Sequence, residues 1–221
     1  MSTTRRPNFV YLLAGLMVTL LAGPIIHEFT DQSAEIIVQV AFSGTLIVGI
    51  WSFIDSRQWF RIGVILAVLE FVVTVFNTVR PSPLLDYTAL VIALIFCGLS
   101  LVFALINVLR GRRMDANRMT GAVCVYLLLG ITLGLVNVFT YRLIPDSFTG
   151  LPINADGEHG LSIIYYTFVT MTTLGYGDIL PVGPLARALA YMAAIAGQFY
   201  IAILVGMMVG VYLSQNQSSS S

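Results

Sequence analysis

The sequence has very little charge and no lysine. Only 10% of its 221 residues are charged, whereas a soluble domain carries about 25%. Eleven arginines balance eleven acids, so the net charge of zero does not indicate a nucleic-acid partner. The two cysteines, Cys97 and Cys124, lie in apolar runs and are typical of small buried residues rather than of a disulfide framework or a metal site. With 57% hydrophobic residues and a mean hydropathy of +0.89, a water-soluble globular protein is excluded and an integral membrane protein is predicted.

Long stretches without charge recur along the chain. A helix that crosses a bilayer needs about 20 mainly apolar residues. Six segments approach or exceed this length: 7–26, 36–54, 62–79, 87–109, 119–141 and 188–213. Glu70, in the segment 62–79, is the only charged residue within them. They predict an all-α integral membrane protein with six transmembrane helices.

The arginines indicate which ends of these helices share a side of the membrane. The segment before the first span and the loops 55–61 and 110–118 hold eight of the eleven arginines and two acids. The loops at the opposite ends hold three arginines and eight acids. Because cytoplasmic loops are enriched in basic residues, we expect both termini in the cytoplasm. The expected location is the plasma membrane, which is the inner membrane if the source is bacterial.

One uncharged stretch, between Glu158 and Asp178, does not suit a spanning helix. It contains a Gly-Tyr-Gly sequence and is soon followed by Pro181. We interpret it as re-entrant. A short pore helix is expected over 161–172, where aromatic residues recur at near-helical spacing, and a non-helical loop is expected after it.

The loop sequence at 172–178, Thr-Thr-Leu-Gly-Tyr-Gly-Asp, suits the chemistry of a cation pore. A dehydrated cation crossing a membrane needs a stack of carbonyl oxygens from non-helical backbone in place of water. Turning successive carbonyls toward one axis requires some residues with positive φ, which Gly175 and Gly177 adopt without steric cost. Thr173 can add a hydroxyl oxygen, and Tyr176 is expected to point away from the axis and pack against aromatic side chains.

The segment 172–178, lying between two predicted spanning helices, resembles the selectivity filter of the potassium channel family, with leucine in place of the valine of TVGYG. The resemblance extends from Met119 to the C-terminal tail. It implies a potassium-selective channel in which K⁺ ions are the only cofactor expected. The residues implied to bind K⁺ are Thr173, Leu174, Gly175 and Tyr176. Gly177 is also implied to be part of the filter. Because this chain has one such loop and a ring of carbonyls needs four, the resemblance implies a homotetramer in the lipid bilayer.

Four residues near this loop are candidates for supporting it: Thr172, Asp178, Tyr165 and Tyr166. Some channels of the family have a glutamate at the position of Val169, where it bonds the filter aspartate. Valine cannot make that bond. Asp178 therefore needs another partner, and we expect a tyrosine hydroxyl.

Three further features allow two interpretations each. Family channels have a glycine at the inner-helix position of Gly197, which makes it a candidate gating hinge, while the alternative is a helix-packing glycine. Gly206 and Gly210 form a GxxxG motif, for which close helix packing is favoured over hinge motion. Glu70, an acid within a span, is a candidate intramembrane sensor, and the alternative is a hydrogen-bonded structural carboxyl facing the helix bundle.

The chain divides into four predicted parts: a cytoplasmic tail (1–8), a four-helix domain placed like a voltage sensor (9–110), a pore domain (111–213) and a disordered cytoplasmic tail (214–221). The sequence has no nucleotide-binding glycine loop, metal-ligand cluster or nucleophile elbow, so we do not expect an enzyme. Two alternatives to a potassium channel stay open. One is a weakly selective cation channel, and the other is a membrane sensor or carrier that contains a channel-like loop.

We predict that gating is nearly independent of membrane voltage. In voltage-gated channels the fourth helix carries regularly spaced arginines, each worth about 2.3 kcal/mol per 100 mV when it crosses the field. The predicted fourth span, 87–109, contains no basic residue. Open probability measured from about −100 to +100 mV in symmetrical potassium should give a flat or shallow curve. A steep sigmoid with several gating charges would contradict this prediction.

Overall fold

The computed structural model describes residues 9–29, 57–109, 116–152 and 159–218. In these ranges the protein is all-α apart from one pair of very short strands, so the predicted fold class is confirmed. The helices are α1 (Phe9–Phe29), α3 (Arg57–Val79), α4 (Pro83–Leu109), α5 (Ala116–Leu143), α6 (Gly160–Met171) and α7 (Pro184–Ser218).

Four of the described helices contain apolar stretches long enough to cross a membrane: Phe60–Asn77, Pro83–Leu109, Asn117–Leu143 and Pro184–Met207. α1 contributes a shorter apolar stretch, Phe9–Ile25, and α6 has 12 residues, as a pore-helix-like element would. The predicted span 36–54 lies outside the described residues. The protein is therefore a multi-pass membrane protein, with a short helix before its last long one.

The turn between α3 and α4 shows how local chemistry sets the helix boundaries. Pro83 is the first residue of α4, where its missing N–H costs nothing. The Asn77 side chain closes the turn, because its Oδ1 accepts a hydrogen bond from the Ser82 N–H at 3.1 Å and its Nδ2 donates one to Asp86 at 2.6 Å. Asp86 lies in the first turn of α4, where the partial positive charge of the helix favours an acid.

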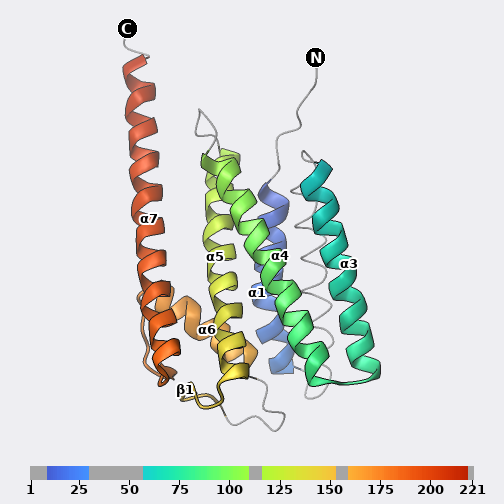
Figure 1. Ribbon diagram of the computed structural model, residues 1–221. Coiled ribbons are helices and arrows are strands. Elements are labelled where there is room, and N and C mark those ends of the chain that lie inside the picture. The colour runs from blue at the N-terminus through green and yellow to red at the C-terminus, as the bar shows by residue number, and fades with distance from the viewer. Residues whose placement is uncertain (1–8, 30–56, 110–115, 153–158, 219–221) are drawn as a thin grey trace.

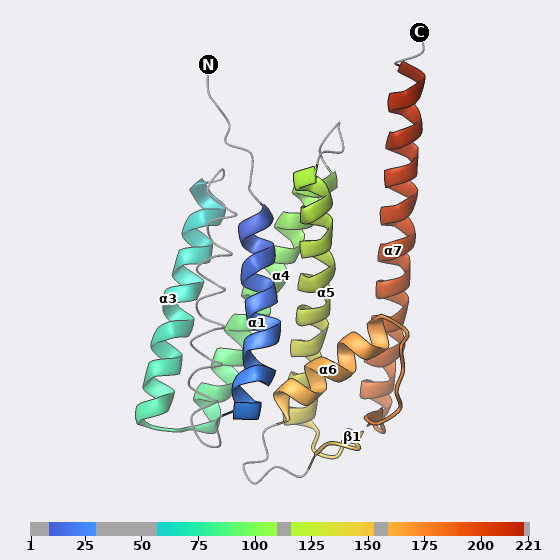
Figure 2. The same ribbon diagram turned by 180° about the vertical axis from the view of Figure 1, so that it is seen from behind.

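α5 is the central helix of the described structure. It contacts α1, α4, α6 and α7, while α3 packs on α4. In Figure 1, α3 and α7 lie at opposite edges of the fold, and α6 runs obliquely beside the lower half of α7. Figure 2 shows α6 from behind, crossing between α5 and α7. α6 thus lies near one end of the long helices and does not run along their full length.

The start of α1 is attached to α5 by its backbone as well as by packing. The Phe9 N–H donates to Asn117 Oδ1 at 3.0 Å, and the Cys124 thiol donates to the Phe9 carbonyl at 3.5 Å. A Cβ on Gly121 would lie 2.8 Å from the Phe9 ring, so this glycine lets the two helices approach closely. Apolar side chains from α1, α4 and α5 extend the contact into the main core.

α7 is attached to α5 at Tyr200. Its hydroxyl donates to the Ala122 carbonyl at 2.6 Å, and its ring packs on Tyr126 with centroids 5.7 Å apart. Lipid tails are as apolar as leucine side chains, so the hydrophobic effect does not drive helices together inside a membrane. Hydrogen bonds between helices, such as this one, therefore contribute to their association together with packing.

Two features of the fold differ from the sequence prediction. β1 (Phe148–Thr149) pairs antiparallel with β2 (Leu180–Pro181), and strands of two residues are too short to produce an alternating pattern. The tail after Leu213 was expected to be disordered, but α7 continues to Ser218. Glutamine, asparagine and serine do not break a helix, and extending a long helix avoids the cost of nucleating a new one.

Candidate functional site

The segment 172–178 leaves the C-terminus of α6 through a tightened last turn. Thr172 N–H donates to the Phe168 carbonyl at 2.9 Å, and the Thr172 hydroxyl donates to the same carbonyl at 2.8 Å. Leu174 and Gly175 N–H groups both donate to the Val169 carbonyl. Thr172 therefore caps the end of α6. The helix end places a partial negative charge beside the segment, and this favours a cation.

The backbone of the segment alternates in conformation. φ is 59° at Thr173, 57° at Gly175 and 79° at Gly177, whereas Leu174 and Tyr176 do not have positive φ. The sequence predicts positive φ at the two glycines only. A β-branched residue such as Thr173 rarely adopts it, and a strained residue of this kind costs about 1–3 kcal/mol. Such outliers cluster at functional sites, so the strained backbone at Thr173 makes this segment a candidate functional site.

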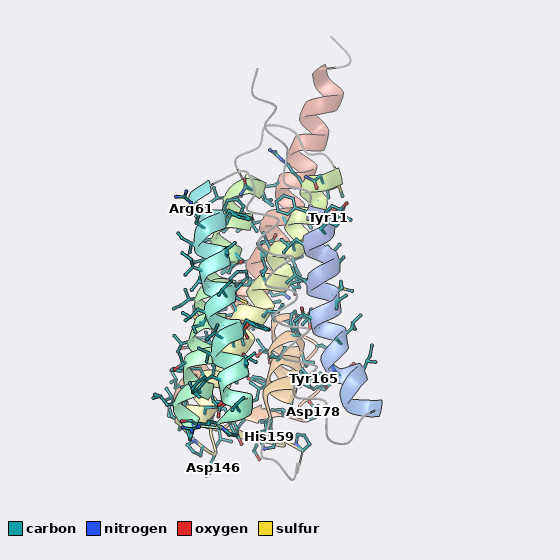
Figure 3. All side chains as sticks on the ribbon, turned by 90° about the vertical axis from the view of Figure 1, so that its right-hand side faces the viewer. Tyr11, Arg61, Asp146, His159, Tyr165 and Asp178 are labelled. Carbon is teal, nitrogen blue, oxygen red and sulfur yellow. The ribbon has the colours of Figure 1, made fainter. Side chains whose placement is uncertain are left out.

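The aspartate at the end of the segment is held by the tyrosine side chain of α6. Tyr165 Oη donates to Asp178 Oδ2 at 2.9 Å, and Figure 3 shows the two side chains together near one end of the molecule. This is the kind of partner expected from the presence of valine at 169. This hydrogen bond links the two ends of the segment, because Tyr165 lies in the helix before it and Asp178 is its last residue.

A small core supports the segment on the side of the strands. Tyr166 is buried and packs edge-to-face on Phe148, with ring centroids 5.3 Å apart, and Ile179 and Ala186 complete the cluster. Gly150, with φ of 81°, lies against the Asp178 carbonyl, where a Cβ would overlap that oxygen. The β1–β2 pair therefore holds the chain leaving the segment against the loop after α5.

α7 supports the other side of the segment. Gly197 is buried against Met171, the last residue of α6, and a Cβ on Gly197 would overlap the Met171 carbonyl oxygen. Next to it, Gln198 Nε2 donates to Thr173 Oγ1 at 3.5 Å. Gln198 was not among the residues predicted from the sequence. A polar side chain inside a long apolar helix was the signal that could have found it.

α5 supports α6 from behind. Asn137 Nδ2 donates to Thr167 Oγ1 at 3.0 Å, and both side chains are fully buried. A Cβ on Gly130 would overlap the Phe168 ring, so this glycine also sets a close approach of the two helices. Both contacts fix the height at which α6 ends, and hence the position of the segment.

Two sequence candidates do not join this arrangement. Glu70 belongs to α3, at the opposite edge of the fold from α7 (Figure 1). Its side chain is buried and accepts a hydrogen bond from Thr74 at 3.2 Å, a geometry that suits the structural alternative. Added Cβ atoms on Gly206 and Gly210 would meet nothing within 4 Å among the described residues, so both positions are open in the single chain.

The match to a protein family covers the C-terminal part of the chain. Residues 123–214 match a family model described as an ion channel. The two pore potassium channel c of Oryza sativa subsp. japonica is 32% identical over 89 residues, which are 40% of this chain and 17% of that relative. No solved structure matches the chain significantly. The C-terminal part of the chain thus contains an ion channel domain.

Replacing Gly197 by alanine distinguishes packing from a hinge. Since its Cβ would overlap the Met171 carbonyl, the packing interpretation expects a loss of about 1–3 kcal/mol, typical of overpacked sites, and a lower thermal midpoint in detergent. Gly98→Ala is the control, because its Cβ would meet nothing within 4 Å. An unchanged midpoint with altered open probability would instead support the hinge.

Proposed function

We propose that the protein is a potassium-selective channel, through which K⁺ flows passively down its gradient in a pore formed by four identical chains. The observation that carries the proposal is the alternating backbone of 173–177, with positive φ at every second residue. A conformation of this kind, following a helix C-terminus, suits a stack of carbonyl oxygens that replaces the hydration shell of an ion.

K⁺ is the proposed ion because the segment offers neutral oxygens in series. The carbonyls of Thr173, Leu174, Gly175 and Tyr176, with the Thr173 hydroxyl, are the proposed ligands, and Gly177 completes the ion path. The leucine at 174 changes a side chain and leaves the carbonyl ligand in place. The relative whose name includes a potassium channel supports the same ion.

Four chains are proposed because one chain supplies one side of the ion path. Leu174 and Tyr176 are 55% and 65% exposed in the single chain, so the segment lies on its surface. α7 also exposes large apolar side chains that neighbouring chains or lipid would cover: Leu185, Tyr191, Met192, Ile195, Phe199 and Ile203. A ring of carbonyls with four-fold symmetry needs four such segments.

The rest of the chain is proposed to hold this pore in the plasma membrane. Residues 111–213 form the pore part and 9–110 the four-helix part, whose α1 and α4 pack directly on α5. Figure 3 shows Arg61 near one end of the molecule and Asp146 near the other. This polarity agrees with cytoplasmic termini, because the arginine-rich end is the one expected inside.

The main alternative is a weakly selective cation channel, and the second is a membrane sensor or carrier with a channel-like loop. The intact Gly-Tyr-Gly sequence favours a potassium-selective channel over a weakly selective cation channel. A carrier is expected to have broken helices in corresponding halves, whereas this chain has one TLGYGD segment.

The test is radioactive rubidium uptake into liposomes that contain the purified protein. The proposal expects rubidium uptake that barium blocks, while sodium is largely excluded from the pore. Gly177→Ala should abolish selective uptake, because alanine adopts the φ of 79° only with strain. Gly160→Ala is the matched control, since that position has ordinary φ and open space.

Three results would count against the proposal. Equal sodium and rubidium permeability in the wild type would favour the weakly selective channel. Uptake that saturates like that of a carrier and resists barium would favour the carrier. Unchanged selectivity in Gly177→Ala would show that the segment is not the filter.

The proposed tetramer should be more stable in potassium than in sodium. Filter carbonyls from four chains repel one another unless a cation lies between them, and an ion that binds only the assembled state stabilises it by mass action. At a hundred times the dissociation constant, this amounts to about 2.7 kcal/mol. Thermal dissociation of the purified tetramer should occur at a higher temperature in potassium; identical midpoints in the two salts would contradict the prediction.

A further inference from the structure

Gln198 is the polar side chain of α7 that contacts the first residue of the alternating segment. Its Nε2 donates to Thr173 Oγ1 at 3.5 Å, a long hydrogen bond between two exposed side chains. Both residues lie on the surface that the proposed pore would enclose. The contact joins the helix that follows the segment to the point where the segment begins.

Gly197 determines how Gln198 reaches this position. Because Gly197 has no Cβ, the backbone of α7 approaches the Met171 carbonyl at the end of α6. The next side chain along α7 then lies beside Thr173, two residues after Met171. A larger residue at 197 would push α7 away and separate the amide of Gln198 from the Thr173 hydroxyl.

The surroundings of Gln198 on α7 are apolar. On the same helix face, one and two turns toward the C-terminus, lie Ile201, Ala202 and Val205, all exposed in the single chain. An uncharged amide in such a helix normally needs a partner, because an unsatisfied polar group in a membrane is unfavourable. On this face, Gln198 is therefore the polar group nearest the segment, and apolar side chains follow it.

We propose that the Gln198 amides, together with the Thr173 hydroxyls, form a cation-binding site at the end of the filter that faces the α7 C-termini. The site rests on the proposed function, because four chains are needed to close it. Its ligand is a monovalent cation such as K⁺, or more tightly a divalent cation of similar size such as Ba²⁺. It adds a side chain of α7 to the oxygens of the filter itself.

The chemistry follows from the hydrogen bond. Nε2 is the donor of the amide, so its donation to Thr173 leaves Oε1 as an acceptor with two lone pairs. Neutral amide and hydroxyl oxygens are suitable ligands for hard cations. The C-terminus of α6 adds partial negative charge at the same height. Without a formal charge the site holds K⁺ weakly, as conduction requires, while a doubly charged ion experiences twice the attraction.

The experiment measures Ba²⁺ block from the α7 C-terminal side in planar bilayers, with wild type, Gln198→Leu and Gln198→Glu. The binding role expects opposite changes. Gln198→Leu removes the oxygen and should weaken block about tenfold, whereas Gln198→Glu adds charge and should strengthen it at least about tenfold, which corresponds to about 1.4 kcal/mol. The strengthened block should fade as the pH falls and the carboxylate is protonated.

Gly98→Ala is the control, since Gly98 lies in α4, away from the segment, and an added Cβ there would meet nothing within 4 Å. Its Ba²⁺ block should equal that of wild type. Block that is unchanged in both Gln198 variants, or weakened in both, would overturn the binding site, because a purely structural contact is lost in either case. A wild type without potassium-selective current would instead overturn the proposed function, and this site with it.

Discussion

The non-helical backbone of 172–178, placed within a membrane protein, is the constraint on which the rest of the structure depends. Irregular backbone inside a bilayer is tolerated only where protein buries it or where it lines a water-filled path. The described contacts hold the segment from three directions: Tyr165 holds Asp178, the end of α6 accepts the first N–H groups, and Gly197 brings α7 against Met171.

α5 connects these supports to the remainder of the chain. Toward α6 it offers the buried Asn137–Thr167 hydrogen bond, and toward α7 it offers the Ala122 carbonyl for Tyr200. Toward α1 it caps the Phe9 N–H with Asn117. Three neighbours are thus fixed to one helix by polar contacts as well as by packing. Helices α1 and α4 are not a separate body beside the ion channel domain, because both share a core with α5.

The sequence predicts those features that depend on composition over many residues or on the special backbone freedom of glycine. The described spans and α6 follow from apolar length, and positive φ follows at Gly175 and Gly177. The positive φ of Thr173 could not be predicted, because its tertiary contacts override the preference of a β-branched residue. The Gln198 contact joins residues that only the packing of α7 on α6 brings together. The β1–β2 pair is too short for any periodic signal.

Two attachments of α7 lie close together near the middle of the helix. Gly197 is held by α6 and Tyr200 by α5, while the helix continues to Ser218. Leu204 still packs against the main core, and the part of α7 beyond it, at 1.5 Å per residue, is about 21 Å long. A tilt of about 5° at its fixed end would displace the free end by about 2 Å, by the same geometry. A force applied near Ser218 would therefore act through a long lever arm on Gly197 and Tyr200, which attach α7 to α6 and α5.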